Sequence, residues 1–258
     1  MWIEAYPHER VLRIALNRPE KRNALNAELC RELSAALEAA DSDPSIGAIL
    51  LCANGKAFCA GMDLREAARA DTRSDPHALS QIHERLFTVH ARLTKPLVAA
   101  VRGAALAGGT GLVANAHVAV AAEDATFGLT EIRVGLWPFL IFRSVTLAIG
   151  ERRAVELALT GRIFSAQEAL GFGLIHQVFA EAEVESAAMK IAQRLSQSSA
   201  AAMRSGLEYA QEIRGRSWRE AGDIGRRIRE QVLQSGDFEE GVAAFMGKRT
   251  PIWPSLPK

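Results

Sequence analysis

Two glycine-containing segments are the parts of this 258-residue sequence that could do chemistry. The segments Asn54–Leu64 and Lys95–Leu112 each place small residues and glycines between an apolar run and a helical pattern. A helix N-terminus presents unpaired backbone N–H groups and partial positive charge, and glycine lets a ligand approach the backbone closely. The segments could therefore hold a phosphate or an oxyanion. Tight packing at a strand–helix junction is the alternative reason for such glycines.

The elements around these segments must bring them together. Apolar runs of strand length occupy Val11–Leu16, Ile46–Cys52, Leu97–Val101 and Val118–Ala121. Helical patterns follow Asn26, an N-cap, and Asp75-Pro76, a cap with proline at the first helical position. Strands that alternate with helices predict an α/β fold with a mainly parallel sheet. Two turns at the carboxyl ends of neighbouring parallel strands could each aim one N–H at a common point.

The second half of the chain is mostly helical. A capping box is predicted at Ser165–Glu168, with Gly171 closing that short helix, and two more helix starts are predicted at Ser217–Glu220 and Asp237–Glu240. From about Glu183 the pattern is almost wholly helical, and no linker rich in proline, glycine or serine is present. We therefore expect an α/β core over residues 1–182 and a C-terminal helical region over 183–258, packed on the core or on a partner subunit.

The composition excludes several classes of protein. A net charge of +1 with 48% hydrophobic and 24% charged residues is that of a soluble globular chain without a global basic field, so no nucleic-acid partner is expected. Three cysteines, an odd and sparse number, favour a reducing compartment. No signal-peptide pattern and no apolar stretch of about 20 residues is seen, so we expect a cytoplasmic protein with no membrane contact.

Several motifs occur in an order that carries a family resemblance. They are Leu16–Leu25, Ala57–Leu64, Lys95–Leu112, Ala125–Gly135, Leu159–Ala169 and the terminal Ala243–Arg249. With these motifs the chain resembles the crotonase, or enoyl-CoA hydratase/isomerase, superfamily over nearly its whole length. The resemblance implies a spiral of β-β-α units with a C-terminal helical region, assembled as a homotrimer or a dimer of trimers. It also implies an acyl-CoA thioester substrate, with coenzyme A as part of the substrate, no separate cofactor and no metal.

The resemblance also implies roles for individual residues. The backbone N–H groups of Met62 and Gly108 would form an oxyanion hole for the thioester carbonyl, and Glu131 would be the acid/base. Substrate-binding positions would be Arg22, Ala24, Lys56, Phe58, Ala60, Asp63, Leu64, Gly109, Trp137, Phe245 and Lys248. The last two match terminal positions that complete the CoA site, sometimes from a neighbouring subunit. The donors are backbone amides, so the motifs contain small residues and need no particular polar side chain. Preorganised amides stabilise an enolate oxygen without reorganising.

Three positions leave alternatives open. Asp63 could lie near the thioester or cap the next helix. Trp137, with Phe139 and Phe142, stands where many hydratases have glycines, and could reshape the acyl pocket or pack the core or a trimer contact. Gly111 occupies the place of a second glutamate that many hydratases use. Some family members that hydrate branched enoyl-CoAs also carry glycine there.

The expected activity is therefore hydration of an enoyl-CoA, with Glu131 as the acid/base. A Δ3–Δ2-enoyl-CoA isomerase that uses Glu131 alone is the first alternative, and a non-catalytic acyl-CoA-binding protein is the second. A third class, a dinucleotide-binding oxidoreductase, is suggested by the Gly-x-Gly-x-x-Ala pattern of Gly109–Ala114 with Glu131 as the ribose-binding acid. This pattern lies mid-chain, and its acid does not end a strand.

Overall fold

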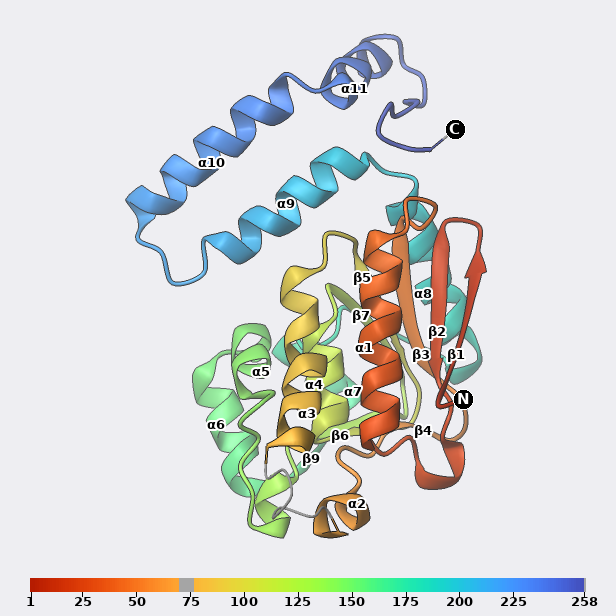
Figure 1. Ribbon diagram of the computed structural model, residues 1–258, viewed down its shortest axis with the longest axis vertical. Coiled ribbons are helices and arrows are strands. Elements are labelled where there is room, and N and C mark those ends of the chain that lie inside the picture. Colours follow the sequence, from red (N-terminus) through yellow and green to blue (C-terminus); the bar gives the residue numbers. More distant parts are fainter. Residues whose placement is uncertain (70–76, 258) are drawn as a thin grey trace.

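A main sheet of six strands forms the body of the protein. The structure, a computed structural model, describes residues 1–69 and 77–257 (Figure 1). The strand order is β1-β2-β3-β5-β7-β10, in which β1 is antiparallel to β2 and the other pairs are parallel. The strands are β1 (Ile3–His8), β2 (Val11–Leu16), β3 (Ala48–Ala53), β5 (Leu97–Val101), β7 (Val118–Ala122) and β10 (Gln177–Phe179).

A second sheet is built from three-residue strands. It contains β4 (Ala57–Cys59), β6 (Ala104–Leu106), β8 (Thr126–Gly128) and β9 (Ile163–Ser165). The strands β4, β6 and β8 are neighbours and parallel, and β9 pairs antiparallel with β8. Each parallel strand follows directly after a strand of the main sheet: β4 after β3, β6 after β5 and β8 after β7. The chain therefore repeats a β-β unit three times, and each unit ends in a turn at the same edge of the small sheet.

Helices cover both faces of the main sheet. In Figure 1, α1 (Ala27–Ser42) and α3 (Ala78–Val89) pack side by side in front of it, and α8 (Val184–Ser196) packs behind, against β3, β5 and β7. The side chain of Asn26 caps α1 as predicted, since its oxygen accepts the N–H of Leu29 at 3.1 Å. The other helices are α2 (Leu64–Arg69), α4 (Gly108–Asn115), α5 (Phe142–Ile149), α6 (Glu151–Thr160), α7 (Ala166–Phe172), α9 (Ala200–Glu212), α10 (Trp218–Leu233) and α11 (Gly236–Met246).

The last three helices extend away from the sheets (Figure 1). Neither α9 nor α10 contains a buried residue. In α8, by contrast, Val184, Ala188 and Ala192 are buried against the body of the protein. The part of the chain set apart from the sheets thus begins at α9, and the expected division after residue 182 stays a prediction. No helix of the described chain is long and apolar enough to cross a membrane.

Most predicted elements are confirmed, and two helix boundaries are wrong. The strands Val11–Leu16 and Leu97–Val101 have the predicted bounds, whereas the strand expected over Ile46–Cys52 is Ala48–Ala53 and that over Val118–Ala121 extends to Ala122. The capping box at Ser165 is present, and the helix predicted to start at Ser217 also begins with a capping box. Gly171 does not end its helix; the left-handed residue that does so is Gly173, with φ +83°. The last helix starts before Asp237, because its N-cap is Ser235 and the Asp237 carboxylate instead accepts the hydroxyls of two serines. The predicted start at Asp75-Pro76 lies outside the described residues.

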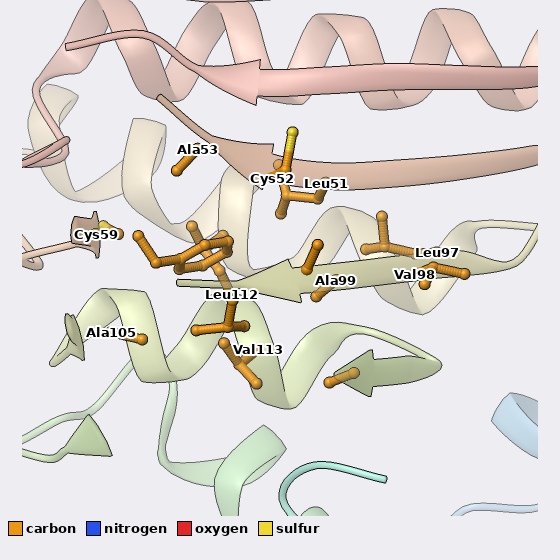
Figure 2. Close-up of a cluster of buried hydrophobic side chains, with 14 of the residues drawn as sticks. Leu51, Cys52, Ala53, Cys59, Leu97, Val98, Ala99, Ala105, Leu112 and Val113 are labelled. Atoms are coloured by element: carbon orange, nitrogen blue, oxygen red, sulfur yellow. The ribbon is translucent and has the colours of Figure 1, made fainter. Parts of the chain in front are cut away.

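The core holds the site-bearing helix in place. Figure 2 shows side chains of β3 and β5 packed against Leu112 and Val113 of α4. Both residues are almost fully buried, so the C-terminal half of α4 is fixed in the core while its first turn faces the small sheet. The thiols of Cys30, Cys52 and Cys59 are all buried and free. Burial raises the pKa of Cys59 to about 12, so this thiol stays neutral.

Candidate active site

Three turns at one edge of the small sheet form the site. Met62 lies three residues after the end of β4, Gly108 two residues after β6, and Glu131 three residues after β8. Neighbouring strands are about 4.8 Å apart, so turns that follow three adjacent parallel strands are brought side by side. The predicted oxyanion-hole residues and the predicted acid therefore come from successive β-β units.

The turn after β4 presents the amide of Met62. Gly61, with φ +88°, makes the bend. The N–H of Leu25 donates to the Gly61 carbonyl at 2.7 Å, and the N–H of Asp63 donates to the Leu25 carbonyl at 2.9 Å. In this parallel bridge the N–H of Met62 points away from Leu25. Among the described residues it has no backbone acceptor.

The turn after β6 presents the amide of Gly108. As the first residue of α4, Gly108 has an N–H with no partner inside the helix. Ala107 before it adopts φ +50° and ψ −120°, a strained conformation that sets the plane of the peptide carrying this N–H. The two turns touch, because a Cβ added to Gly61 would lie 2.7 Å from the Cβ of Ala107 and 3.4 Å from the nitrogen of Gly108. Both amides therefore belong to one site.

A cavity of about 510 Å³ opens beside these amides. Its wall is mainly apolar and includes Leu25, Ala60, Met62, Leu64, Ala67, Leu79, Ser80, His83, Phe87, Ala107, Gly108, Thr130, Glu131, Val134, Leu136, Trp137, Pro138, Phe139, Leu140 and Ile141. The Oε2 atom of Glu131 is buried and has no hydrogen-bond partner in the described chain. Burial raises the pKa of this carboxyl to about 7. A group with such a pKa can take and give a proton near neutral pH.

The place of a second acid is filled by an apolar side chain. A Cβ added to Gly111 would lie 2.3 Å from Cγ2 and 2.7 Å from Cβ of Ile141. Glu131 is the only carboxylate among the described residues that line the cavity. A scheme with two carboxylates is therefore not built into this site.

An open groove of about 870 Å³ leads out of the cavity. It is lined by Arg18, Glu20, Lys21, Arg22, Ala24, Ala60, Met62, Asp63, Leu64, Arg65 and Glu66. Ala60, Met62 and Leu64 line both spaces, so the groove and the cavity adjoin at these residues. The structure thus brings together the predicted positions Arg22, Ala24, Ala60, Asp63 and Leu64.

Asp63 caps a helix and also lines this groove. Its Oδ1 accepts the N–H groups of Arg65 and Glu66 at the start of α2, at 3.0 and 3.2 Å. Its Oδ2 pairs with Arg18 at 2.7 Å. Burial alone would raise the pKa of Asp63, but these hydrogen bonds and the guanidinium lower it. The carboxylate therefore stays ionised and holds the turn that carries Met62.

Five predicted positions lie outside both spaces. Lys56 is exposed beyond the groove, and the ring of Phe58 is fully buried in the core. Gly109 packs α4 on β4, since a Cβ there would lie 2.3 Å from the carbonyl oxygen of Cys59. Phe245, 80% exposed, and Lys248 lie at the α11 end of the molecule, opposite α2 (Figure 1). One chain alone does not bring these last two residues to its own cavity.

The aromatic residues after Gly135 divide between the cavity and the core. Trp137 and Phe139 both line the cavity, and Phe139 is 73% exposed at its edge. The ring of Trp137 also packs on Phe142, with 5.4 Å between the centroids. Phe142 packs against the hydrophobic core and does not line the cavity. Trp137 therefore serves both of the roles that the sequence left open.

Sequence reasoning missed His83, which lines the cavity from α3. His83 and His90 are seven residues apart in the sequence, a spacing that does not favour a metal site on a helix. Within the described residues, no group of three or more His, Cys, Asp or Glu side chains is placed to hold a metal ion. The available signal was a histidine on the apolar face of the predicted helix, four residues before Phe87.

Known proteins share both the sequence pattern and this arrangement. The profile of the enoyl-CoA hydratase/isomerase family matches residues 7–255. A Mycobacterium bovis protein named "Probable enoyl-CoA hydratase echA8" is 37% identical over 94% of each chain. The Aspergillus fumigatus "Mevalonyl-coenzyme A hydratase sidH" is 32% identical over 96% of this chain and 93% of its own. A crystal structure of an enoyl-CoA hydratase from Mycobacterium smegmatis superposes with a TM-score of 0.93, at 30% identity, over 98% of this chain and 99% of that chain.

Proposed function

This chain belongs to the enoyl-CoA hydratase/isomerase family, and on that premise we propose that it adds water across the double bond of a 2-enoyl-CoA thioester. One observation carries the proposal. Glu131, whose Oε2 atom is buried and has no partner in the described chain, lines the same cavity as Met62 and Gly108. A reaction at the carbon next to a thioester carbonyl needs an acid/base group to move the proton and amide donors to stabilise the charge on the oxygen.

The two amides stabilise the charge that forms during the reaction. When water attacks C3 of a conjugated thioester, negative charge develops on the thioester oxygen. The N–H groups of Met62 and Gly108 are held by the backbone of two strand-end turns, so they need no reorganisation to bind that oxygen. Donors of this kind contribute about 10²–10³ in rate each.

Glu131 moves the proton at C2. With a pKa of about 7, its carboxyl is present in both forms at neutral pH. As the acid it donates a proton to C2 while the water oxygen bonds to C3, and as the carboxylate it recovers a proton afterwards. The net reaction adds one water molecule and leaves the enzyme unchanged.

The open groove is the proposed site of the coenzyme A moiety. Lys21, Arg22 and Arg65 line it with exposed cationic side chains, which suit the phosphates of coenzyme A. Arg18 is already paired with Asp63. Since groove and cavity meet at Met62, the thioester would lie at their junction and the acyl chain in the apolar cavity. Completion of the CoA site by Phe245 and Lys248 of a neighbouring copy, in a trimer or a dimer of trimers, is part of this proposal.

Isomerisation is the second candidate, because Ile141 fills the place of a second acid. With Glu131 as the only carboxylate of the cavity, the site could take a proton from C2 of a 3-enoyl-CoA and return it at C4. The same amides would hold the dienolate oxygen.

Incubation with 2-enoyl- and 3-enoyl-CoA in ¹⁸O-labelled water separates the two candidates. Hydration places the label in a 3-hydroxyacyl-CoA, whereas isomerisation moves the double bond without label. Glu131→Gln must abolish the reaction, and Glu123→Gln, which changes an exposed glutamate of the turn before β8, must not. Acyl-CoA binding with no turnover of either substrate would instead indicate a non-catalytic binding protein.

A further inference from the structure

We propose that His83 is a second catalytic residue. It is the base that takes the proton from the attacking water, while Glu131 donates the proton to C2. This inference rests on the proposed hydration and assigns a role that the sequence motifs do not give. His83 and Glu131 are the two titratable side chains among the described residues of the cavity wall.

His83 is a buried residue of the cavity wall. Its side chain lies on α3 at 6% exposure, and its buried Nε2 atom has no partner in the part of the chain that the structure describes. Phe87, one turn later on the same helix, lies beside the oxyanion turn, since a Cβ added to Gly108 would be 3.1 Å from its Cζ atom. The helix that carries His83 therefore runs beside the place where the thioester would bind.

The free nitrogen of His83 can accept a proton. Burial lowers the pKa of His83, and a hydrogen bond with the backbone of Leu25 raises it. Only an acceptor, the carbonyl, raises the pKa of an imidazole in this way, so the nitrogen facing Leu25 carries the ring proton. Nε2, the nitrogen without a partner, then carries the lone pair.

A buried acceptor without a partner calls for a ligand. Leaving such an atom unsatisfied costs about 1–3 kcal/mol, and a hydrogen-bond donor brought to it when substrate and water bind removes that cost. The position where many relatives carry a second acid is closed here by Ile141 against Gly111. Hydration moves two protons, one off the water and one onto C2, so a second group lets both move in one step.

The step balances with the two groups together. The water oxygen bonds to C3 as its proton passes to Nε2 of His83. The electron pair of the C2=C3 bond moves toward the thioester, whose oxygen is held by the amides of Met62 and Gly108, and C2 then takes the proton of the Glu131 carboxylic acid. The imidazolium returns its proton through water to the Glu131 carboxylate, which restores both residues.

His90 offers a matched control. It is a second histidine of the α3 region, it also has a buried ring nitrogen without a partner, Nδ1, and burial lowers its pKa to about 4. It does not line the cavity. Replacing His90 therefore measures the general effect of losing a buried imidazole next to the same helix.

The test compares His83→Gln, His90→Gln and the unchanged protein in two assays. The first is hydration of crotonyl-CoA, with kcat and KM determined separately. The second is exchange of the C2 protons of butyryl-CoA with solvent deuterium, which has no water to activate and needs Glu131 alone. We expect His83→Gln to lower kcat for hydration by about 100-fold or more and to leave exchange within about threefold, while His90→Gln changes neither. Hydration by His83→Ala should recover when imidazole is added.

Each other outcome overturns an identified part of the account. If His83→Gln hydrates crotonyl-CoA as fast as the unchanged protein, the role of His83 fails and the proposed function stands. If His83→Gln loses exchange together with hydration, or imidazole does not restore the His83→Ala variant, His83 is only structural. If the unchanged protein hydrates no enoyl-CoA, the proposed function fails and the role of His83 fails with it.

Discussion

The strand-end turns and the C-terminal helices of this chain are built in opposite ways. In the turns at residues 60–62, 107–109 and 129–131, Gly61, Gly108, Gly109 and Leu129 are buried, and neighbouring turns are in contact. In the helices α9 and α10 no residue is buried. Trp218 is 96% exposed and Phe245 is 80% exposed.

This difference separates the part of the site that a single chain builds by itself from the surface that is available to another molecule. The turns fix two amides and one carboxyl by backbone contacts within a single chain, so small changes there should act on catalysis. The C-terminal helices leave large apolar side chains in solvent, which is typical of a surface that another molecule covers. Changes there should act on assembly and leave the chemistry of the cavity intact.

The largest expected effect is that of Glu131→Gln in the third turn. The amide keeps the size of the side chain but cannot carry the proton to C2, so kcat should fall by about 10²–10⁴-fold. The measurement is steady-state hydration of an enoyl-CoA, with thermal unfolding as the control for folding. If the variant retains more than about a tenth of the activity, Glu131 is not the group that carries the proton to C2.

The same carboxyl predicts a pH dependence of stability. The pKa of Glu131 is about 7 in the folded protein, above its ordinary value of 4.5, so the folded state binds more protons between these values. Its contribution to stability is full below pH 4.5 and is lost as the pH rises through 7, by about 3 kcal/mol. Urea unfolding at pH 5 and pH 8 should show this loss in the unchanged protein and not in Glu131→Gln. Equal pH dependence in both would contradict the raised pKa.

Gly61→Ala tests the first turn against the C-terminal helices. The new Cβ would lie 2.7 Å from that of Ala107, at a backbone φ of +88°, so the Met62 amide should shift and kcat should fall by about 100-fold. Gly222→Ala in α10, where no atom lies within 4 Å, should leave kcat unchanged. A similar effect of both substitutions on kcat would erase the contrast between the two regions.

Gly111→Ala tests how tightly the turn of α4 is packed. Its Cβ would meet Ile141 at 2.3 Å, so the free energy of unfolding should fall by about 1–3 kcal/mol. Gly206→Ala in α9, again in open space, should keep or raise stability because alanine favours helix. Denaturant unfolding of both variants gives the comparison, and a stable Gly111→Ala protein would show that Ile141 can move aside.

The smallest effect on the isolated subunit is expected for Trp218→Ser. This side chain makes little contact with its own chain, so subunit stability should change by less than about 0.5 kcal/mol. In the proposed trimer or dimer of trimers, sedimentation velocity should instead show weaker assembly. If the variant assembles as the unchanged protein does, Trp218 lies outside the subunit contacts.

The long elements of the fold could be predicted because their patterns are local. Leu97–Val101 is a continuous apolar run, Val11–Leu16 is interrupted only by Arg13, and Ser165 and Ser217 carry complete capping boxes. The small sheet could not be predicted from pattern, because strands of three residues carry no measurable period. The pattern indicated that the two glycine-containing turns could converge, but the assignment of Met62, Gly108 and Glu131 to one site came only from the family resemblance.

Some expected site positions lie outside the cavity and the groove of a single chain, and one residue of the cavity wall was not expected. The resemblance marked stretches of backbone and did not show which side chains reach the cavity. Phe58 lies inside β4 and its ring is buried in the core, whereas Ala60 follows the end of the strand and lines the cavity. His83 was missed because a single histidine on an apolar helix face is typical of a core residue. Only the structure shows that it lines the cavity and that its Nε2 atom has no partner.

A crystal structure of the protein with a 3-hydroxyacyl-CoA bound tests the central claim most directly. The account predicts the thioester oxygen within about 2.7–3.1 Å of the backbone nitrogens of both Met62 and Gly108, with the Glu131 carboxyl next to C2. A thioester oxygen that contacts neither amide, or a Glu131 carboxyl turned away from C2 toward solvent, would contradict it.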